Sequence, residues 1–408
     1  MKKSNKKWVR FRHKVVTALL RYTLGTFSKL KYGVKVEKFK DEGKRNYLVL
    51  SNHQTAFDQF FVGLAFKQPL YYMATEDLFS NGFTSKLINY LVAPIPIKKS
   101  TTDVRAVMDC MRVAKQGGSI AIFPEGNRTF SGKTEHIKDT VAQLAKALKL
   151  PIALFHLEGG YGVHPRWSDK VRKGKMRAYV HRVIEPEEYL KLSNEELYEI
   201  ICQGIYVNEG NSENVYKSKQ SAESLERAMY YCPKCGLSSW ESHRDTITCQ
   251  GCGTAVKYTD TTELVGANEP FPYKFVTEWY DAQSNYVKSL DPISFGDTPI
   301  YSDMIRLFKV IPYKKKEKLL KAGKLVLFAD RLEIQYEENK EQKTQAFPIE
   351  DISSMAVLGK NKINLYSGND IYQITGLENN FCALKYVQLY YHFTNVRNGG
   401  SNGEFLGL

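Results

Sequence analysis

Between residues 46 and 199 the apolar positions follow two alternating patterns. Short aliphatic runs, typical of buried strands, are separated by segments whose apolar side chains recur every three or four positions, as on one face of a helix. The expected strands cover residues 47–50, 70–73, 94–97, 119–123, 152–157 and 175–183. The expected helices cover residues 59–66, 84–91, 104–115, 137–148 and 193–204. This alternation predicts an α/β domain with a mixed sheet flanked by helices.

The pattern changes in the last third of the chain. From residue 324 onward, apolar side chains recur at every second position in several short segments, and a helix is expected over residues 380–395. Several strands followed by one capping helix resemble the β-sandwich of pleckstrin-homology (PH) and GRAM-like domains. Before it, residues 271–291 place large apolar side chains on one helical stripe, so residues 263–323 are expected to form a helical connector.

The first 34 residues are both basic and apolar. Seven Lys or Arg fall within residues 1–14, with Trp8 and Phe11 among them, and an interrupted apolar pattern continues to Leu30. The segment has neither the clean apolar core and cleavage site of a signal peptide nor a run of about 18 apolar residues. It predicts an interfacial helix whose basic residues face anionic lipid while Trp8 and Phe11 enter the acyl boundary. The alternative is an amphipathic helix docked on its own domain.

Length and charge distribution indicate several domains with different partners. A chain of 408 residues exceeds the size at which one core usually stops growing. Residues 1–200 hold 35 Lys and Arg against 19 Asp and Glu, whereas residues 201–408 hold 23 against 25. The first half would therefore attract phosphorylated metabolites, anionic lipid or nucleic acid. The expected division is an interfacial segment (1–34), an α/β domain (35–204), a polar linker (205–228), a cysteine module (229–262), a connector (263–323), a β domain (324–397) and a disordered tail (398–408).

Two strand ends carry candidate chemistry. The strand at residues 47–50 leads into His53-Gln54-Thr55-Ala56-Phe57-Asp58, in which a turn can fold Asp58 back onto the imidazole. A carboxylate that accepts Nδ1–H raises the basicity of Nε2, which can then take a proton from a hydroxyl. No G-x-S-x-G elbow or nearby cysteine is present, which favours direct transfer over a covalent acyl-enzyme.

The strand at residues 119–123 ends in Phe123-Pro124-Glu125-Gly126-Asn127-Arg128-Thr129. Glycine and proline at a strand end allow the backbone to approach a ligand closely, and Arg128 offers a planar, permanently charged fork for phosphate. A buried structural turn is the alternative for this loop taken alone.

Together these two motifs resemble the lysophospholipid acyltransferase family, which includes 1-acylglycerol-3-phosphate acyltransferase. The resemblance spans roughly residues 10–200 and includes Leu150-Pro151-Ile152-Ala153. It implies that His53 is the general base, oriented by Asp58, and that Glu125, Gly126, Arg128 and Thr129 form the pocket for the acceptor's phosphate. It further implies an acyl thioester donor on coenzyme A or acyl carrier protein and no catalytic cofactor.

The chain departs from the family's second sequence block. That block usually ends in an acidic residue and an arginine, whereas residues 94–99 end in Lys98 and Lys99. Lysine keeps the positive charge for a phosphate but loses the bidentate geometry. The two lysines are therefore candidate substrate-binding residues, with a solvated charged turn as the alternative.

The cysteine module predicts a structural metal site. Cys232, Cys235, Cys249 and Cys252 form two C-x-x-C pairs separated by 13 residues, and a glycine follows each pair. Such pairs hold one tetrahedral Zn²⁺ in a small β-ribbon and leave no open position for catalysis. Four paired thiols also indicate a reducing compartment.

The sequence as a whole favours an acyltransferase at the cytoplasmic face of a membrane, peripheral or monotopic, acting most simply on 1-acylglycerol-3-phosphate. The alternative is a non-enzymatic membrane-associated lipid-binding or scaffold protein. Nucleic acid is not expected as a partner, because the ribbon lies in the half of the chain without a basic excess and no aromatic and basic stacking pattern accompanies it.

Overall fold

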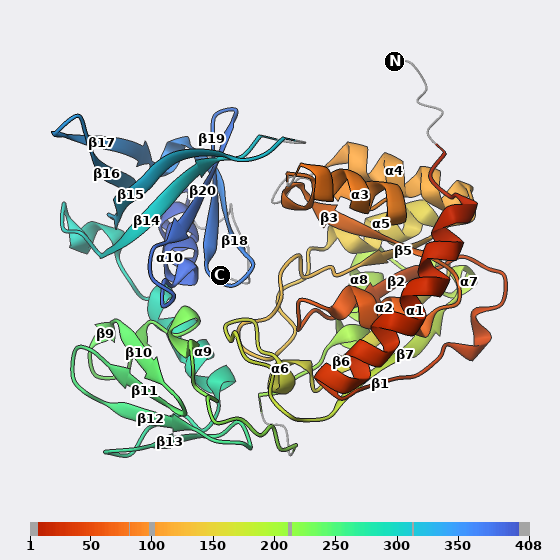
Figure 1. The fold of residues 1–408 in the computed structure, drawn as a ribbon, viewed down its shortest axis with the longest axis horizontal. Coiled ribbons are helices and arrows are strands. Elements are labelled where there is room, and N and C mark those ends of the chain that lie inside the picture. Colours follow the sequence, from red (N-terminus) through yellow and green to blue (C-terminus); the bar gives the residue numbers. More distant parts are fainter. Residues whose placement is uncertain (1–6, 81, 98–102, 211–213, 312–313, 400–408) are drawn as a thin grey trace. The chain divides into compact units, whose positions relative to one another are not determined.

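The computed structural model describes residues 7–80, 82–97, 103–210, 214–311 and 314–399, which divide into two compact units (Figure 1). The first unit comprises Met1–Thr129, Lys133–Pro165 and Val171–Glu209. The second comprises Phe130–Gly132, Arg166–Lys170 and Gly210–Leu408, so two short segments from the first half of the sequence pack within it.

A seven-stranded mixed sheet forms the centre of the first unit. Its strands lie in the order β1-β7-β6-β2-β5-β3-β4. The strands from β6 to β4 are mutually parallel, β7 runs antiparallel to β6, and β1 is parallel to β7. Their bounds are β1 Val34–Val36, β2 Leu48–Ser51, β3 Leu70–Thr75, β4 Ile95–Ile97, β5 Ser119–Ile122, β6 Ile152–Glu158 and β7 Met176–Ile184. The expected mixed sheet is present, and β2 to β7 each lie within two residues of their predicted bounds, whereas β1 was not predicted.

Helices cover this sheet as the sequence pattern predicts. The apolar faces of α4, α5 and α8 pack with β2, β5 and β6 in one core, while α1 and α2 lie with β1 and β7 (Figure 1). The helices are α1 Phe11–Tyr32, α2 Asp58–Ala65, α3 Phe83–Val92, α4 Val104–Lys115, α5 Thr140–Leu148, α6 Gly160–Val163, α7 Pro186–Tyr189 and α8 Asn194–Ile205. Local signals set their ends: the Asp103 side chain accepts from Ala106 N–H before α4, and Ser193 and Glu196 form a capping box on α8.

Helix α1 packs one face on its own unit and leaves the other exposed. His13, Ser28 and Tyr32 are buried, and the Arg21 guanidinium donates to the carbonyl of Phe66 at 2.7 Å. The opposite stripe exposes five large apolar side chains, namely Phe11, Val15, Leu19, Tyr22 and Leu30. The helix is therefore docked on its own unit and also exposes an apolar stripe, and the interfacial role of that stripe stays a prediction.

Trp8 does not take the position expected of it. Its side chain is 1% exposed in the core of the first unit, and its backbone N–H donates to Gln116 Oε1 at 2.8 Å. The burial of an indole among apolar side chains outweighs any gain from a lipid boundary. Trp8 therefore anchors the start of α1 to the protein, while Phe11, 79% exposed, remains available to lipid.

The second unit joins a cysteine ribbon to a seven-stranded antiparallel sheet. The ribbon consists of a two-stranded and a four-stranded sheet, and the larger sheet has the order β17-β16-β15-β14-β20-β19-β18. The ribbon strands are β8 Tyr231–Cys232, β9 Gly236–Leu237, β10 Trp240–His243, β11 Thr246–Cys249, β12 Ala255–Tyr258 and β13 Leu264–Gly266. The large sheet contains β14 Tyr301–Lys309, β15 Glu317–Leu327, β16 Arg331–Glu338, β17 Glu341–Pro348, β18 Ile352–Leu358, β19 Lys362–Ser367 and β20 Asp370–Gly376, and the helices are α9 Val276–Lys288 and α10 Ala383–Arg397.

Two segments of the second unit differ from the sequence expectation. The expected connector contains α9, but also β14 and the first part of β15, whose exposed charged residues obscure the alternation of apolar positions. Residues 215–228, expected in a polar linker, contribute Tyr216, Ala222, Leu225 and Ala228 to the buried interior. Few apolar positions suffice because Ala222, Leu225 and Ala228 join one buried cluster with residues of the ribbon, α9 and α10. Short 3-10 helices at Lys40–Glu42, Glu76–Phe79, Leu225–Arg227, Pro292–Phe295 and Ile349–Asp351 complete the described elements.

Candidate functional site

The two motifs of the first unit leave neighbouring strands at the same edge of the sheet. Strands β2 and β5 are parallel, with Leu50 opposite Ile122, so both chains emerge on one side. His53 and Glu125 each follow within three residues of their strand's end. Ligands of open α/β sheets bind outside the carboxyl ends of the strands, which makes this edge the candidate site.

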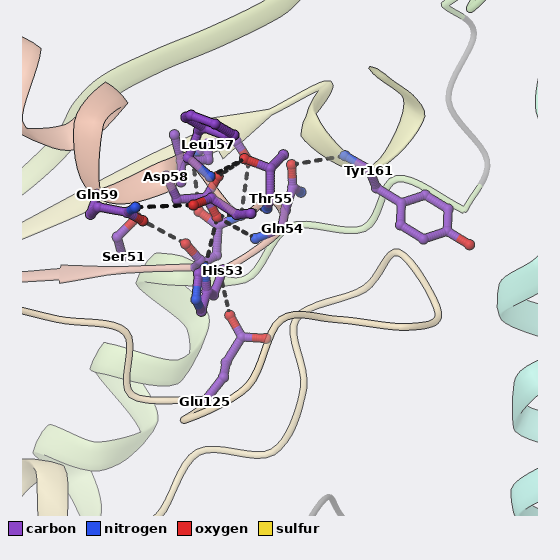
Figure 2. Close-up of polar contacts among 12 residues, drawn as sticks. Ser51, His53, Gln54, Thr55, Asp58, Gln59, Glu125, Leu157 and Tyr161 are labelled. Carbon is purple, nitrogen blue, oxygen red and sulfur yellow. Dashed lines mark hydrogen bonds and ion pairs between the residues drawn. The ribbon is translucent and has the colours of Figure 1, made fainter. Parts of the chain in front are cut away.

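His53 and Asp58 meet as the sequence predicts. The Nδ1 atom of His53 lies 2.8 Å from Asp58 Oδ2 (Figure 2). The imidazole stacks on the ring of Phe123, with centroids 4.1 Å apart. The Asp58 side chain is fully buried, whereas that of His53 is 19% exposed. The carboxylate thus holds Nδ1 and fixes the orientation of the imidazole.

Asp58 is held by the turn that precedes it. Its Oδ2 accepts the backbone N–H groups of Gln54 at 2.6 Å and Thr55 at 2.8 Å, and Oδ1 accepts the Thr55 hydroxyl at 2.6 Å (Figure 2). These donors compensate for burial of the charge, and they fix the carboxylate where His53 needs it. The five-residue spacing works because residues 54–57 form a turn and α2 begins only at Asp58.

Glu125 joins the two loops. One carboxylate oxygen accepts the backbone N–H of His53 at 2.6 Å and the other accepts that of Glu135 at 2.7 Å. In the opposite direction, the Thr129 N–H donates to the His53 carbonyl at 3.0 Å. Burial raises the pKa of Glu125 well above its usual value, and the donated N–H groups oppose that rise. One oxygen of Glu125 therefore holds the histidine loop, and the other holds the backbone at Glu135.

Tyr32, at the end of α1, belongs to the same site, although nothing in its sequence context indicated this. The side chain is 1% exposed and packs against Phe57 and Phe61, at ring distances of 5.1 and 5.4 Å, and no hydrogen-bond partner for its hydroxyl is found within the described residues. Burial raises the pKa of Tyr32 to about 12, Asp58 adds to the rise and Arg128 opposes it. Burial likewise lowers the pKa of Arg128, while Asp58 and Tyr32 raise it. Tyr32 therefore packs on the turn between His53 and Asp58 through its contact with Phe57.

Further buried polar groups connect the histidine loop to the segment at residues 159–161. The side-chain oxygen of Gln54 accepts the Tyr161 N–H at 3.2 Å, and a Cβ on Gly160 would approach that oxygen to 2.4 Å. The buried Glu209 carboxylate accepts the Gly159 N–H. Burial raises the pKa of Glu209 from its usual 4.5 to about 7, against the hydrogen bonds that it receives from Gly159, Gly162 and Gln54. The burial of Glu209 could not be predicted from the sequence, because its hydrogen-bond partners are about 50 residues away or more.

We expect Glu209→Gln to flatten the pH dependence of stability. The folded protein binds the Glu209 proton more tightly than the unfolded chain, so ionisation costs stability as the pH rises from about 4.5 to about 7. The free energy of unfolding should fall in this window, by at most roughly 3 kcal/mol from this group, and the amide should remove that fall. Urea unfolding of both proteins at pH 5 and pH 8 measures it. Identical pH profiles for the two proteins would contradict the assignment.

The remaining predicted pocket residues differ in how they are placed. Gly126 is exposed with φ +67°, a left-handed conformation that favours glycine, and no described atom lies within 4 Å of an added Cβ. Thr129 is buried and its hydroxyl donates to the Glu135 carboxylate at 3.1 Å. Lys98 and Lys99 lie outside the described residues.

The four paired cysteines converge in the ribbon of the second unit. Their Sγ atoms all lie within 4.8 Å of one another, with Cys232 and Cys252 3.6 Å apart and Cys235 and Cys249 3.9 Å apart. Four thiolates about 2.3 Å from a tetrahedral Zn²⁺ would be separated by roughly 3.8 Å, so the spacing fits such an ion. The glycine after each pair, Gly236 or Gly253, has φ +74°, which closes the turn around the thiols.

The first half of the chain is similar to known acyltransferases. Residues 33–154 match the family model described as Acyltransferase. A 1-acyl-sn-glycerol-3-phosphate acyltransferase of Bacillus subtilis (strain 168) is 23% identical over 170 residues, which are 41% of this chain and 81% of that protein. The chloroplastic 1-acyl-sn-glycerol-3-phosphate acyltransferase BAT2 of Brassica napus is 24% identical over 137 residues, 33% of this chain and 40% of that protein.

Among solved structures, the chain is similar to the 1-acyl-sn-glycerophosphate (LPA) acyltransferase PlsC from Thermotoga maritima, with a sequence identity of 23% and a TM-score of 0.39. The match covers 48% of this chain and 82% of that chain. The matched family segment, residues 33–154, contains both motif loops and the strands that place them side by side. The protein is therefore an acyltransferase, and residues 33–154 are the part of its first unit that matches the family model.

Proposed function

We propose that this enzyme transfers a fatty acyl group from a thioester, on coenzyme A or acyl carrier protein, to the hydroxyl of a lysophospholipid. The most economical acceptor is 1-acylglycerol-3-phosphate, which would give phosphatidic acid. The observation that carries the proposal is the 2.8 Å contact between His53 Nδ1 and the buried Asp58 carboxylate, beside the loop that bears Arg128. The two relatives are both named 1-acyl-sn-glycerol-3-phosphate acyltransferases, which supports this acceptor.

The chemical step needs one base and one leaving group. Nε2 of His53 takes the proton of the acceptor hydroxyl as the oxygen attacks the thioester carbonyl carbon. The tetrahedral intermediate then loses the thiolate as the C–S bond breaks, and the imidazolium returns the proton to sulfur. The products are the new ester and a free thiol, and His53 is neutral again. Asp58 stabilises the transient imidazolium, so no metal is required at this step.

The acceptor's phosphate is assigned to the Arg128 side of the site. Arg128 shares its surroundings with Tyr32, whose buried hydroxyl could donate to a phosphate oxygen. Gly126 leaves its backbone open to a ligand, while Glu125 and Thr129 act as positioning residues through the hydrogen bonds to His53. Lys98 and Lys99 remain candidates for the same anion.

Arg128→Ala should raise KM for 1-acylglycerol-3-phosphate by about 10- to 100-fold, the loss expected for charge-assisted hydrogen bonds. Arg128→Lys should recover part of this, because the charge remains but the planar fork is lost. Steady-state acyl transfer to acceptors with and without a phosphate monoester separates recognition from chemistry. A similar loss with a neutral lysolipid acceptor would remove Arg128 from phosphate recognition.

The exposed stripe of α1 is assigned to a membrane surface, at its cytoplasmic face. Within the described residues, no helix is both long enough and apolar enough to cross a bilayer. Phe11, Leu19, Tyr22 and Leu30 are each at least 66% exposed along one side of α1, a position suited to the acyl boundary. The acceptor and product are themselves lipids of that surface.

The second unit is assigned two accessory roles. The cysteines would hold a structural Zn²⁺, since four thiolates fill a tetrahedral shell. The antiparallel sheet with its C-terminal helix α10 would be a PH or GRAM-like module for lipid or partner recognition. Neither role requires a catalytic cofactor.

A further inference from the structure

A cleft between the start of α1 and helix α3 has the composition of a second anion site. It has a volume of about 290 Å³, and its lining includes Lys7, Arg10, Arg12 and Lys86. Among the described residues that line it, none is acidic. None of them belongs to the loops around His53. The cleft is near the lower end of the roughly 300–1,000 Å³ typical of ligand pockets, which suits a headgroup better than a whole lipid.

The walls of the cleft are held in place. The Arg12 Nε donates to the Tyr90 carbonyl at 2.9 Å, and its guanidinium stacks 4.0 Å from the centre of the Tyr90 ring. On the other side, Trp8 is buried and its N–H donates to Gln116. Arg10 Nε donates to the Lys7 carbonyl at 3.0 Å. Two of the four cations, Arg10 and Arg12, are therefore already held in place, which lowers the entropic cost of binding a ligand.

In addition to burial, the positive charge of Arg12 and Arg10 lowers the pKa of a neighbouring buried histidine, His13. Burial lowers the pKa of His13, and Arg12 and Arg10 lower it further, against a contribution from the Tyr90 backbone. His13 itself is turned inward, with Nδ1 3.0 Å from the Tyr71 hydroxyl. The positive field at this end of α1 therefore comes from groups without a compensating carboxylate among the described lining residues.

The surroundings of the cleft indicate which anion it receives. Helix α3 exposes Phe83 at 79%, Leu87 at 44% and Tyr90 at 58%, spaced at i, i+4 and i+7 on one face. Phe11 of α1, which lies between Arg10 and Arg12 in the sequence, is 79% exposed. Cations edged by exposed aromatic and aliphatic side chains match the phosphate and acyl levels of a bilayer surface.

We propose that the α1–α3 cleft, formed by Lys7, Arg10, Arg12 and Lys86, binds the phosphate headgroup of an anionic phospholipid in the membrane and fixes the enzyme on that surface. The inference rests on the membrane docking given under the proposed function. It adds helix α3 to the docking surface and a lipid site separate from the acceptor site. The bound lipid is neither acceptor nor product during this contact.

The test compares Arg10→Glu/Lys86→Glu with Lys44→Glu/Lys191→Glu, a control with the same change in charge at exposed lysines of the same unit. Sedimentation with vesicles of phosphatidylcholine, alone or mixed with phosphatidylglycerol, measures binding. Wild type should prefer the mixed vesicles, and the cleft variant should lose that preference by about tenfold or more, from a contribution of about 1 kcal/mol per cation. The control should lose much less. Both variants should keep the wild-type unfolding temperature and activity on a short-chain, water-soluble lysophosphatidic acid.

Five outcomes would overturn the inference. If both variants lose the preference for mixed vesicles equally, the effect is one of net charge. If the cleft variant keeps the preference, the cleft does not bind the lipid. Displacement of the mixed vesicles by millimolar glycerol 3-phosphate would make a free phosphate ester the ligand. If wild type binds neither vesicle, membrane docking fails as well. If it binds both equally well, docking stands and only the cleft is excluded.

Discussion

Replacing His53 with alanine should lower kcat/KM for acyl transfer by about 10²- to 10⁴-fold, the range expected for loss of a general base. The imidazole is 19% exposed and stacks on Phe123, so its removal leaves no large buried cavity and the protein should remain folded. The effect is measured as the rate at which free thiol is released during acyl transfer. Asp58→Ala should lower activity too, but it also removes the acceptor for the Gln54 and Thr55 N–H groups and should cost stability.

A matched histidine is available in the same unit. His181 on β7 is exposed and stacks on His156 with ring centroids 4.4 Å apart, well away from the motif loops in the sequence. His181→Ala should retain wild-type kcat/KM. Full activity of His53→Ala beside a normal unfolding temperature would exclude His53 as the base. A stable acyl-protein adduct after acid quenching would instead indicate a covalent route.

The largest effect on stability should follow from loss of the metal ligands. Cys232→Ser should remove one bound zinc per chain and unfold the ribbon, since structural zinc contributes about 10–16 kcal/mol in small modules and whole domains are stable by only about 5–15 kcal/mol. Cys232 and Cys249 belong to the same buried cluster as Trp279, so the loss should spread through the second unit. Metal analysis by mass spectrometry and thermal unfolding measure both consequences.

Cys202→Ser is the control for that experiment. Cys202 is a half-buried thiol on α8 of the first unit and lies outside the cysteine cluster. Its replacement should leave the zinc content unchanged. If Cys232→Ser retains one zinc per chain and the wild-type unfolding temperature, the four-thiolate site is excluded.

Much of the site could be predicted from sequence because its members are close along the chain. His53 and Asp58 are five positions apart, and the turn between them supplies the donors that hold the carboxylate. The C-x-x-C pairs likewise carry their geometry locally, with a glycine at each turn. In the first unit, strands and helices followed the periodicity of apolar side chains, because burial against a sheet imposes periods of 2.0 and 3.6 residues.

Periodicity failed where exposed and buried positions did not alternate in a simple way. Strand β15 begins with mainly exposed residues, and helix α10 is buried on all sides from Ala383 to Phe393, including Lys385. The Lys385 ammonium is paired with Asp303 at 2.7 Å, a partner from a distant strand that no local pattern indicates. A buried charge is tolerated only when such a partner is present.

The sequence by itself determined the α/β alternation, the histidine and carboxylate pair, the cysteine module and the excess of positive charge in the first half, because these are properties of neighbouring residues and of composition. Only the tertiary structure decided that Trp8 is buried, that Tyr32 packs on the histidine loop, that Glu125 holds the His53 backbone and that α3 joins α1 in one basic cleft. Each of these depends on contacts between residues that are far apart along the chain. Such contacts are selected by packing and by hydrogen bonding of buried groups in the complete fold, so no local pattern encodes them.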